Sequence, residues 1–255
     1  MHCICVLVSL KFEADYLLDC LGGIKKRIVS GFTVYDGVLG EVPVRIIKTG
    51  MGKAHIDTSL FSSCSIVVST GVCGALNGEL RTGDVVVAEE IVFIPEEQIE
   101  DLVGGTVQDY SLYRTTLLRI KNSRLDLDAL IKVISEHETG KPGLRVLRGR
   151  IITVPRVIGK VEEKRKLGSY FQAIACDMED FFRAAPLIEA GIPFVSARVV
   201  IDELSDEVPP SIGAFAYRPF KAFYLLKKLP LAKRAVAFLV EKIASFSSLF
   251  IFDSP

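Results

Sequence analysis

The chain has 255 residues, 49% of them hydrophobic, which is enough to form a large core in one α/β domain. Its 31 basic residues equal its 31 acidic residues, and no nucleic-acid motif is present, so nucleic acid is excluded as a partner. The three histidines have no partner at metal-ligand spacing, and the six cysteines form no CxxC pair. We therefore expect one cytoplasmic domain over residues 1–255, with small buried thiols in a reducing compartment and no cofactor or metal.

Apolar runs and helical patterns alternate along the chain, which predicts a mixed β-sheet flanked by helices. The expected strands are 4–10, a pair within 28–49 that turns at Asp36-Gly37, 65–70, 84–93, 144–154, 172–176 and 193–201. The expected helices are 12–21 with a stop at Gly22-Gly23, 53–62, 124–138, 161–167 and 180–190. The region 94–122 has poor periodicity and carries no predicted element.

Carboxylates follow two neighbouring strands of this sheet, at the points where the strands end. Asp177 and Glu179 close the apolar run 173–176, and Asp202 closes the run 193–201. In open α/β sheets ligands bind beyond the carboxyl ends of the strands, so we expect both acidic groups to face one cleft. The alternative is a helix cap at Asp177 or Glu179 and a solvated loop after Asp202.

Five stretches of sequence carry a resemblance to a known family. They are LKFEADYLL at 10–18, TGMGKAH at 49–55, STGVCGALNGELRTGDVVVAEEI at 69–91, DMED at 177–180 and RVVID at 198–202. With these motifs the chain resembles the nucleoside phosphorylase and nucleosidase superfamily, which includes the methylthioadenosine/S-adenosylhomocysteine nucleosidases. The pattern DMED with IDELSDEVPP is most similar to the hopanoid-associated, phosphorylase-like branch. The resemblance implies a single-domain three-layer α/β/α fold and a homo-oligomer.

The activity that the resemblance implies is cleavage of the N-glycosidic bond between ribose and a purine. Such an enzyme needs an acid at the departing base and a nucleophile at C1′ of the sugar. Asp202 matches the family residue that supports protonation of purine N7. Glu179 matches the carboxylate that accepts hydrogen bonds from the ribose 2′ and 3′ hydroxyls, and Met178 matches the apolar surface under the sugar.

Two further charged residues gain a role from the resemblance. Glu13 lies shortly after the first strand, where the family residue that activates water stands; read alone, it is an ordinary acid in a helical first turn. Arg198 lies four residues before Asp202, a spacing that puts both on one face of a strand. It matches the family arginine that helps to hold the nucleophile.

The remaining expected contacts are backbone and apolar positions. They are Gly50 and Gly52 at the nucleophile, Gly71, Val72, Cys73 and Gly74 in a ligand-lining turn, and Val157 and Ile158 against the base. A plain strand-to-helix turn remains the alternative for Gly50 and Gly52. An aromatic residue often stands at the place of Val157, so the smaller side chain leaves the identity of the base open.

Departures from the family pattern bear on the nucleophile. Phosphorylases of the purine type carry an Arg and a Ser around the turn where this chain has Ser69 and Val72, and the loss of these donors disfavours phosphate. Lys53 or Arg198 could still bind phosphate. We therefore expect hydrolysis that releases a purine, adenine in first place, from a nucleoside with a modified 5′ group. The alternatives are a phosphorylase and a non-catalytic nucleoside-binding protein.

The C-terminal segment 213–255 is rich in basic and apolar residues, and we expect helices that break at Pro230. Such a pattern suits an element that lies in a membrane surface, which would bring the enzyme to a lipid-linked substrate through residues 218–252. The segment is too short and too charged to span a bilayer. Packing on the sheet or on a second subunit is the alternative.

Overall fold

The computed structural model describes residues 3–105, 116–120, 126–136, 143–209 and 219–251, of which 116, 219–226 and 246–251 are described by their backbone alone. The strands are β1 Cys3–Val8, β2 Gly22–Val29, β3 Phe32–Leu39, β4 Val42–Lys48, β5 Cys64–Ala75, β6 Val85–Phe93, β7 Thr116–Arg119, β8 Val146–Thr153, β9 Ala175–Asp177 and β10 Phe194–Asp202. The helices are α1 Lys11–Leu18, α2 Glu96–Gly104, α3 Leu127–Ser135, α4 Val161–Phe171, α5 Asp180–Glu189 and α6 Pro219–Ile251, with a 3-10 turn at Thr58–Phe61.

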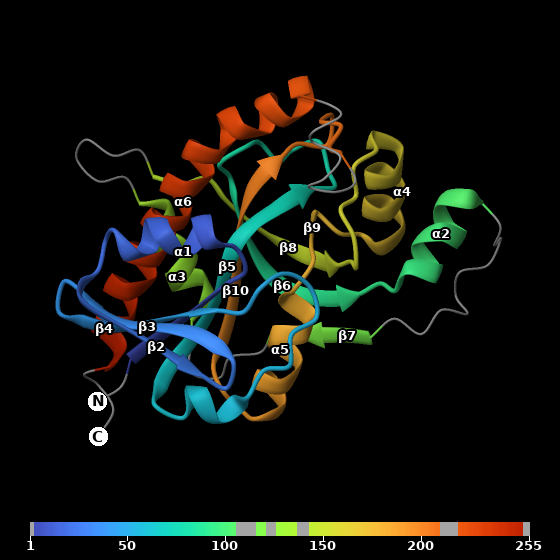
Figure 1. Ribbon diagram of the computed structural model, residues 1–255. Coiled ribbons are helices and arrows are strands. Elements are labelled where there is room, and N and C mark those ends of the chain that lie inside the picture. The colour runs from blue at the N-terminus through green and yellow to red at the C-terminus, as the bar shows by residue number, and fades with distance from the viewer. Residues whose placement is uncertain (1–2, 106–115, 121–125, 137–142, 210–218, 252–255) are drawn as a thin grey trace.

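These strands form one mixed sheet, and part of the sheet closes on itself. β10 pairs in parallel with β5 and antiparallel with β6, and the path from β6 through β8 and β9 leads back to β5. A closed ring of five strands results, from which β1, β4, β3 and β2 extend beside β5. The expectation of a mixed sheet flanked by helices is confirmed (Figure 1).

β1 shows why the sheet needs helices on both sides. Its residues are all buried, and alternate side chains point to opposite faces. Ile4, Val6 and Val8 pack in a cluster with α1, α3 and α6, whereas Cys5 and Leu7 pack in a second cluster with α5. The continuous apolar run near the N-terminus is therefore the pattern of a strand that is buried on both faces.

The prediction of two strands within 28–49 that turn at Asp36-Gly37 is wrong. Three strands, β2 to β4, cover this region, and the turns contain Gly31 and Gly40 with φ angles of 81° and 60°. Asp36 lies inside β3, where its carboxylate pairs with Arg27 of β2 and Arg45 of β4, each at 2.7 Å. Two cross-strand arginines thus hold an aspartate where a turn was expected.

Other predicted boundaries also need correction. Gly22-Gly23 begin β2, although α1 ends shortly before them at Leu18. The range 53–62 contains only a 3-10 turn, capped by the Asp57 carboxylate, and no α-helix. The strand expected at 65–70 continues to Ala75, because β5 pairs along its whole length with β1, β10 and β9.

α6 is one helix with Pro230 inside it, so the predicted break at this residue is wrong. Its buried apolar residues pack on α1, α3 and the sheet; they are Ala232, Ala235, Val236, Ala237, Leu239, Val240, Ile243 and Ala244. In the described ranges, no helix combines the length and apolar character needed to cross a bilayer. Residues 213–218 and 252–255 of the predicted C-terminal segment lie outside the described residues, as do the side chains of 219–226 and 246–251.

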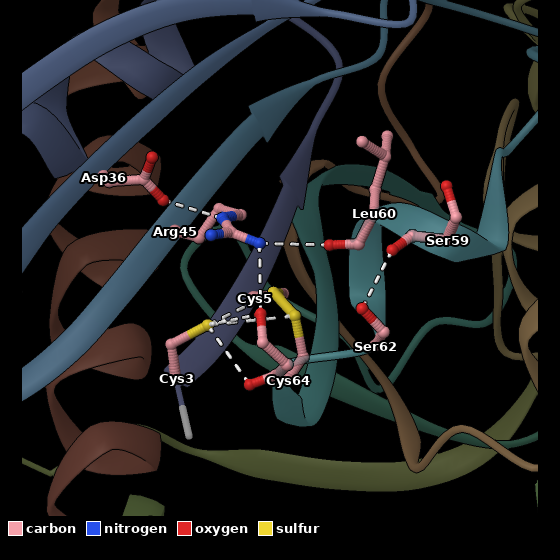
Figure 2. The surroundings of a disulfide bond; sticks show 9 residues. Cys3, Cys5, Asp36, Arg45, Ser59, Leu60, Ser62 and Cys64 are labelled. Atoms are coloured by element: carbon pink, nitrogen blue, oxygen red, sulfur yellow. Dashed lines mark hydrogen bonds and ion pairs between the residues drawn. A yellow bond between two sulfur atoms is a disulfide. The ribbon is translucent and has the colours of Figure 1, made fainter. Parts of the chain in front are cut away.

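A disulfide between Cys5 and Cys64 joins β1 to β5 (Figure 2). The expectation that every cysteine is a free thiol is therefore wrong, and the argument for a reducing compartment loses its support. Apolar neighbours predict that a cysteine is buried, but they do not reveal which strand pairing brings two thiols together. The Cys3 sulfur lies 3.9 Å from both disulfide sulfurs. Within the described part of the chain, no other group of three or more possible metal ligands lies so close together.

The disulfide predicts a specific thiol count. Without reductant the denatured protein should titrate four thiols, at Cys3, Cys20, Cys73 and Cys176, and with reductant six. Because the bond spans 59 residues, reduction should lower the free energy of unfolding by about 2–4 kcal/mol. Thiol titration in denaturant and denaturant melts with and without reductant measure both effects. Cys64→Ala should abolish the response to reductant and Cys20→Ala should not; six thiols without reductant would contradict the bond.

Candidate active site

A cavity of about 530 Å³ opens at the carboxyl ends of the strands. It is lined by the ends of β5, β9 and β10 and by residues that follow β1 and β8. Nine of the predicted site residues line it: Glu13, Val72, Cys73, Gly74, Val157, Ile158, Met178, Glu179 and Asp202. The expectation that the acidic groups after β9 and β10 face one cleft is confirmed for Asp177, Glu179 and Asp202.

Glu13 lies in the first turn of α1 and is only 3% exposed. Its Oε2 atom accepts hydrogen bonds from the backbone N–H groups of Ser9 and Leu10, both at 2.9 Å, and Oε1 accepts one from Val72 at 3.1 Å. Burial raises the pKa of this carboxyl group, although the Leu10 hydrogen bond and the charge of Arg198 act in the opposite direction. A carboxylate held in this way is oriented firmly and is a stronger base than an exposed glutamate.

Gly71 explains how Glu13 comes so close to β5. A Cβ atom at this position would lie 2.5 Å from Glu13 Oε1 and 3.1 Å from Arg198 Nη1, and its φ angle of 140° suits glycine alone. The predicted ligand-lining turn at Gly71 to Gly74 is wrong, because these residues continue β5, but Val72, Cys73 and Gly74 do line the cavity. The strand itself, rather than a turn, forms this wall.

Glu179 is the N-cap of α5 and is buried. Its carboxylate lies between two other residues that were expected in the site. The N–H of Gly52 donates to Glu179 Oε1 at 3.1 Å, and Arg198 Nη1 lies 3.6 Å from Oε2. Gly50 and Gly52 both have positive φ angles, and no helix follows them, so the alternative of a strand-to-helix turn is wrong. Met178 precedes Glu179 and lines the same cavity.

Arg198 lies behind the cavity wall, 1% exposed, among carboxylates. Its guanidinium contacts Asp180 through Nε at 2.9 Å and through Nη2, and Nη2 also lies 2.7 Å from Asp177. Burial and the nearby Asp180 raise the pKa of Asp177 to about 7, although Arg198 opposes the shift. Together with Glu179, three carboxylates surround one arginine, so this arginine offers little positive charge to a bound anion.

A second buried arginine was missed by the sequence reasoning. Arg183 of α5 donates to the hydroxyl oxygens of Ser69 at 2.8 Å and of Ser9 and Thr49 at 2.6 Å each. Ser9 and Thr49 directly follow β1 and β4, and Ser69 lies within β5, so the arginine links three neighbouring strands beside the cavity. Ser69 in turn donates to Asp180 at 2.6 Å, which explains its presence where a phosphate ligand was considered.

Asp202 ends β10 and is 9% exposed. Its Oδ2 atom lies 2.5 Å from the Nζ atom of Lys164, which is fully buried on α4. Burial raises the pKa of Asp202, while the Lys164 charge and hydrogen bond act against this rise. Lys164 could not be predicted, because the pattern EEKRK on a helix is typical of a solvated face.

The side of the cavity formed after β8 carries Arg156, Val157 and Ile158. Arg156 is the one basic residue among the described side chains of the lining, and it pairs with Glu96 at 2.6 Å and Glu163 at 3.3 Å. These partners raise the pKa of the guanidinium against the effect of its partial burial. Arg156 was not predicted, since nothing in the sequence separates it from a surface arginine.

Comparison with known proteins places this geometry in a family. The profile of the phosphorylase superfamily matches residues 3–218. A 5′-methylthioadenosine/S-adenosylhomocysteine nucleosidase of Staphylococcus aureus is 26% identical over 217 residues, which cover 82% of this chain and 90% of the relative.

Two solved structures have the same fold. One is the 5′-methylthioadenosine/S-adenosylhomocysteine nucleosidase of Neisseria meningitidis in complex with methylthio-immucillin-A, with a TM-score of 0.69 at 20% identity. The match covers 95% of this chain and 98% of the nucleosidase chain. A futalosine hydrolase mutant of Helicobacter pylori has a TM-score of 0.69 at 21% identity, covering 95% and 100%. The resemblance seen in the sequence is thereby confirmed, and the chain belongs to the phosphorylase superfamily.

Proposed function

We propose that the protein is a nucleosidase, which cleaves the N-glycosidic bond of a purine nucleoside by attack of water and releases the free base. The observation that carries this proposal is the charge of the cavity. Four carboxyl groups, Glu13, Asp177, Glu179 and Asp202, line it, and its one described cation, Arg156, is already paired. The relatives named above, two nucleosidases and a hydrolase, support the same reaction class.

The arrangement suits water better than phosphate as the nucleophile. A phosphate needs free cationic or hydroxyl donors. Asp177, Asp180 and Glu179 neutralise Arg198, and Arg183 donates through its two Nη atoms to hydroxyl groups, while its Nε atom is buried. A phosphate at this place would also face the carboxylates of Glu13 and Glu179. Water meets no such repulsion, and a buried carboxylate can remove its proton.

In the proposed reaction, Glu13 takes a proton from water while the water oxygen forms its bond to C1′. The bond from C1′ to the base breaks, its electron pair stays on the purine, and Asp202 gives a proton to the purine. Glu179 accepts hydrogen bonds from the ribose hydroxyls, and Met178 supports the sugar. Gly52 and Arg198 hold Glu179 in position from behind. The product pair is a free base and a free ribose derivative.

The choice of water predicts that base release needs no phosphate. In phosphate-free buffer a panel of purine nucleosides, with the 5′ group varied, should yield free base and a reducing sugar. Added phosphate should change the rate by less than twofold and yield no ribose 1-phosphate. Chromatography of base and sugar products measures this; a rate that depends on phosphate would instead establish the phosphorylase, and binding without turnover would establish a nucleoside-binding protein.

The proposal extends to a modified 5′ group and to adenine as the base. The apolar residues Leu10, Phe12 and Leu229 line the cavity with Glu13, so an apolar 5′ substituent would find a compatible surface. The similarity to the hopanoid-associated branch supports a lipid-linked nucleoside as one substrate for the panel. We also propose that residues 1–255 act as one domain in a homo-oligomer.

We also propose that the protein contacts a membrane surface through α6. Much of the apolar face of α6 is used in the core, so the contact would depend on basic residues such as the exposed Lys227 and Arg234. The intact protein should sediment with anionic liposomes at low salt, less at high salt, and less again in Lys227→Glu/Arg234→Glu. The Asp15→Lys variant, which adds a basic residue on the exposed side of α1, is a control for non-specific charge. Equal sedimentation of all variants, or none, would leave only the packing role of α6.

A further inference from the structure

Lys164 lies at the centre of a small buried polar site behind Asp202. Besides Asp202 Oδ2, its Nζ atom donates to the backbone carbonyl oxygens of Glu203 at 2.9 Å and Asp206 at 3.0 Å. An ammonium group has three N–H donors, and three oxygen atoms accept them here. Within the described residues, Lys164 is the only side chain with a hydrogen bond or ion pair to the Asp202 carboxylate. The geometry therefore fits a charged lysine that has one counter-ion, and this counter-ion is the proposed acid.

Close packing of α4 against the loop after β5 places this lysine beside Asp202. Gly168, one turn later on α4, faces the loop after β5, and a Cβ atom there would lie 2.5 Å from the Leu76 carbonyl oxygen. Glycine thus lets α4 approach the strand ends closely enough for Lys164 to reach β10. Desolvation makes a buried lysine unfavourable unless it is paired, and a structural role alone would be filled equally well by an apolar side chain. The presence of a buried ammonium group at this position therefore indicates that Lys164 acts on Asp202.

We propose that Lys164 is a positioning residue that stores, at Asp202, the proton that the departing purine receives; this inference rests on the proposed nucleosidase reaction. In the resting pair one proton is shared between a carboxylate and an amine. As the bond from C1′ to the base breaks, the proton moves from Lys164 Nζ to Asp202 Oδ2, and Oδ2 passes it on to the purine, which leaves a neutral amine and a carboxylate. The pair then regains its proton from water when the products leave, because Asp202 faces the cavity.

The other titratable groups that face Asp202 do not supply this proton. The thiols of Cys73 on β5 and Cys176 on β9 face Asp202, and burial raises both pKa values, that of Cys176 to about 12, so both stay neutral. Asp206, in the loop, and Lys228, on α6, also face it, but they form their own ion pair at 2.5 Å. A proton held by two basic groups leaves at a higher pH than one held by a carboxyl group alone. Because the Lys164 ammonium group can pass a proton to the carboxylate, Asp202 can act as an acid even where its own carboxyl group, whose pKa the Lys164 charge lowers, is ionised.

The test is the pH profile of Lys164→Met, which keeps the length of the side chain but has no proton to share. At acidic pH, where buried Asp202 is protonated unaided, kcat should stay within about tenfold of the wild type. Above the pKa of the lone carboxyl group it should fall about tenfold for each pH unit, while the wild type remains active. Lys166→Met removes a half-buried lysine from the same helix, which contacts Glu162 and Val103 rather than Asp202, and should leave the profile unchanged. In an Asp202→Asn background Lys164→Met should cost nothing further.

A second readout does not depend on the substrate. In Lys164→Met the folded-state pKa of the unpaired Asp202 lies above its unfolded value, so its contribution to stability is present at low pH and is lost as the pH rises through the folded pKa. The Tm of Lys164→Met should therefore fall relative to the wild type as the pH rises, and Asp202→Asn should abolish this difference. An even loss of kcat at every pH, or a Tm difference that does not vary with pH, would overturn the inference. A wild type that releases no base would overturn the proposed function instead.

Discussion

Asp202→Asn should reduce kcat for base release by about 10²- to 10⁴-fold, which is the usual contribution of a general acid. Asparagine keeps the shape of the side chain and can still accept a hydrogen bond from Lys164, but it has no proton to give to the purine. KM should change much less than kcat, because the substitution leaves the sugar contacts that we propose for Glu179 and Met178 in place. Steady-state kinetics on the best nucleoside of the panel measures both constants.

The same variant removes the counter-ion of a buried lysine, and this effect must be separated from catalysis. Breaking a buried pair on one side costs about 3–5 kcal/mol, so a lower Tm is expected along with the lower kcat. Circular dichroism at the assay temperature shows whether the variant is folded. Glu207→Gln changes an exposed acid in the following loop and should leave kcat unchanged. A folded Asp202→Asn with wild-type kcat would remove Asp202 from the mechanism.

The strand ends of the site could be predicted because they depend on local pattern. Asp177, Glu179 and Asp202 each follow an apolar run, and the carboxyl ends of neighbouring strands meet at one edge of a sheet. The expected grouping of these three carboxylates in one cleft is confirmed. The apolar runs of β1 and β10 were found for the same reason, since a strand buried on both faces leaves a continuous signal.

The partners behind these carboxylates could not be predicted, because they depend on contacts between distant elements. Lys164 reaches Asp202 over 38 positions in the sequence, and Arg183 reaches Ser9 over 174. On their helices both residues resemble ordinary surface charges, and only the packing of α4 and α5 on the sheet buries them. Cys5 and Cys64 illustrate the same limit, since their bond follows from the pairing of β1 with β5.

The extent of β5 shows a second limit of local reasoning. Gly71 and Gly74 predict a turn by composition, yet both lie within the strand. Added Cβ atoms would lie 2.5 Å from Glu13 Oε1 at Gly71 and 3.0 Å from Asp202 Oδ2 at Gly74. Glycine is needed at both positions because a side chain of the site approaches the strand so closely that a Cβ atom would not fit. A glycine can be required because another group approaches the backbone closely or because the chain turns. The sequence alone does not distinguish these two reasons.

Glu13→Gln should also reduce kcat by about 10²- to 10⁴-fold, because glutamine cannot remove a proton from water. Burial raises the pKa of Glu13, so the wild-type rate should fall as the pH drops through a value above the ordinary range of a glutamate. This acid limb should be absent from the residual activity of the variant. A kcat profile over pH for both proteins, with substrate at saturating concentration, measures the two effects together.

The controls for this prediction follow from the surroundings of Glu13. Its carboxylate accepts three backbone N–H groups, and the amide of glutamine would turn a donor toward at least one of them, at a cost of about 1–3 kcal/mol. A domain of this size should remain folded after such a loss, which a thermal melt can verify. Asp15→Asn, on the exposed side of the same helix, should keep both kcat and the acid limb. If Glu13→Gln keeps the acid limb, another group activates the water, and Asp177, whose burial and neighbouring Asp180 raise its pKa to about 7, is then the next carboxylate to substitute.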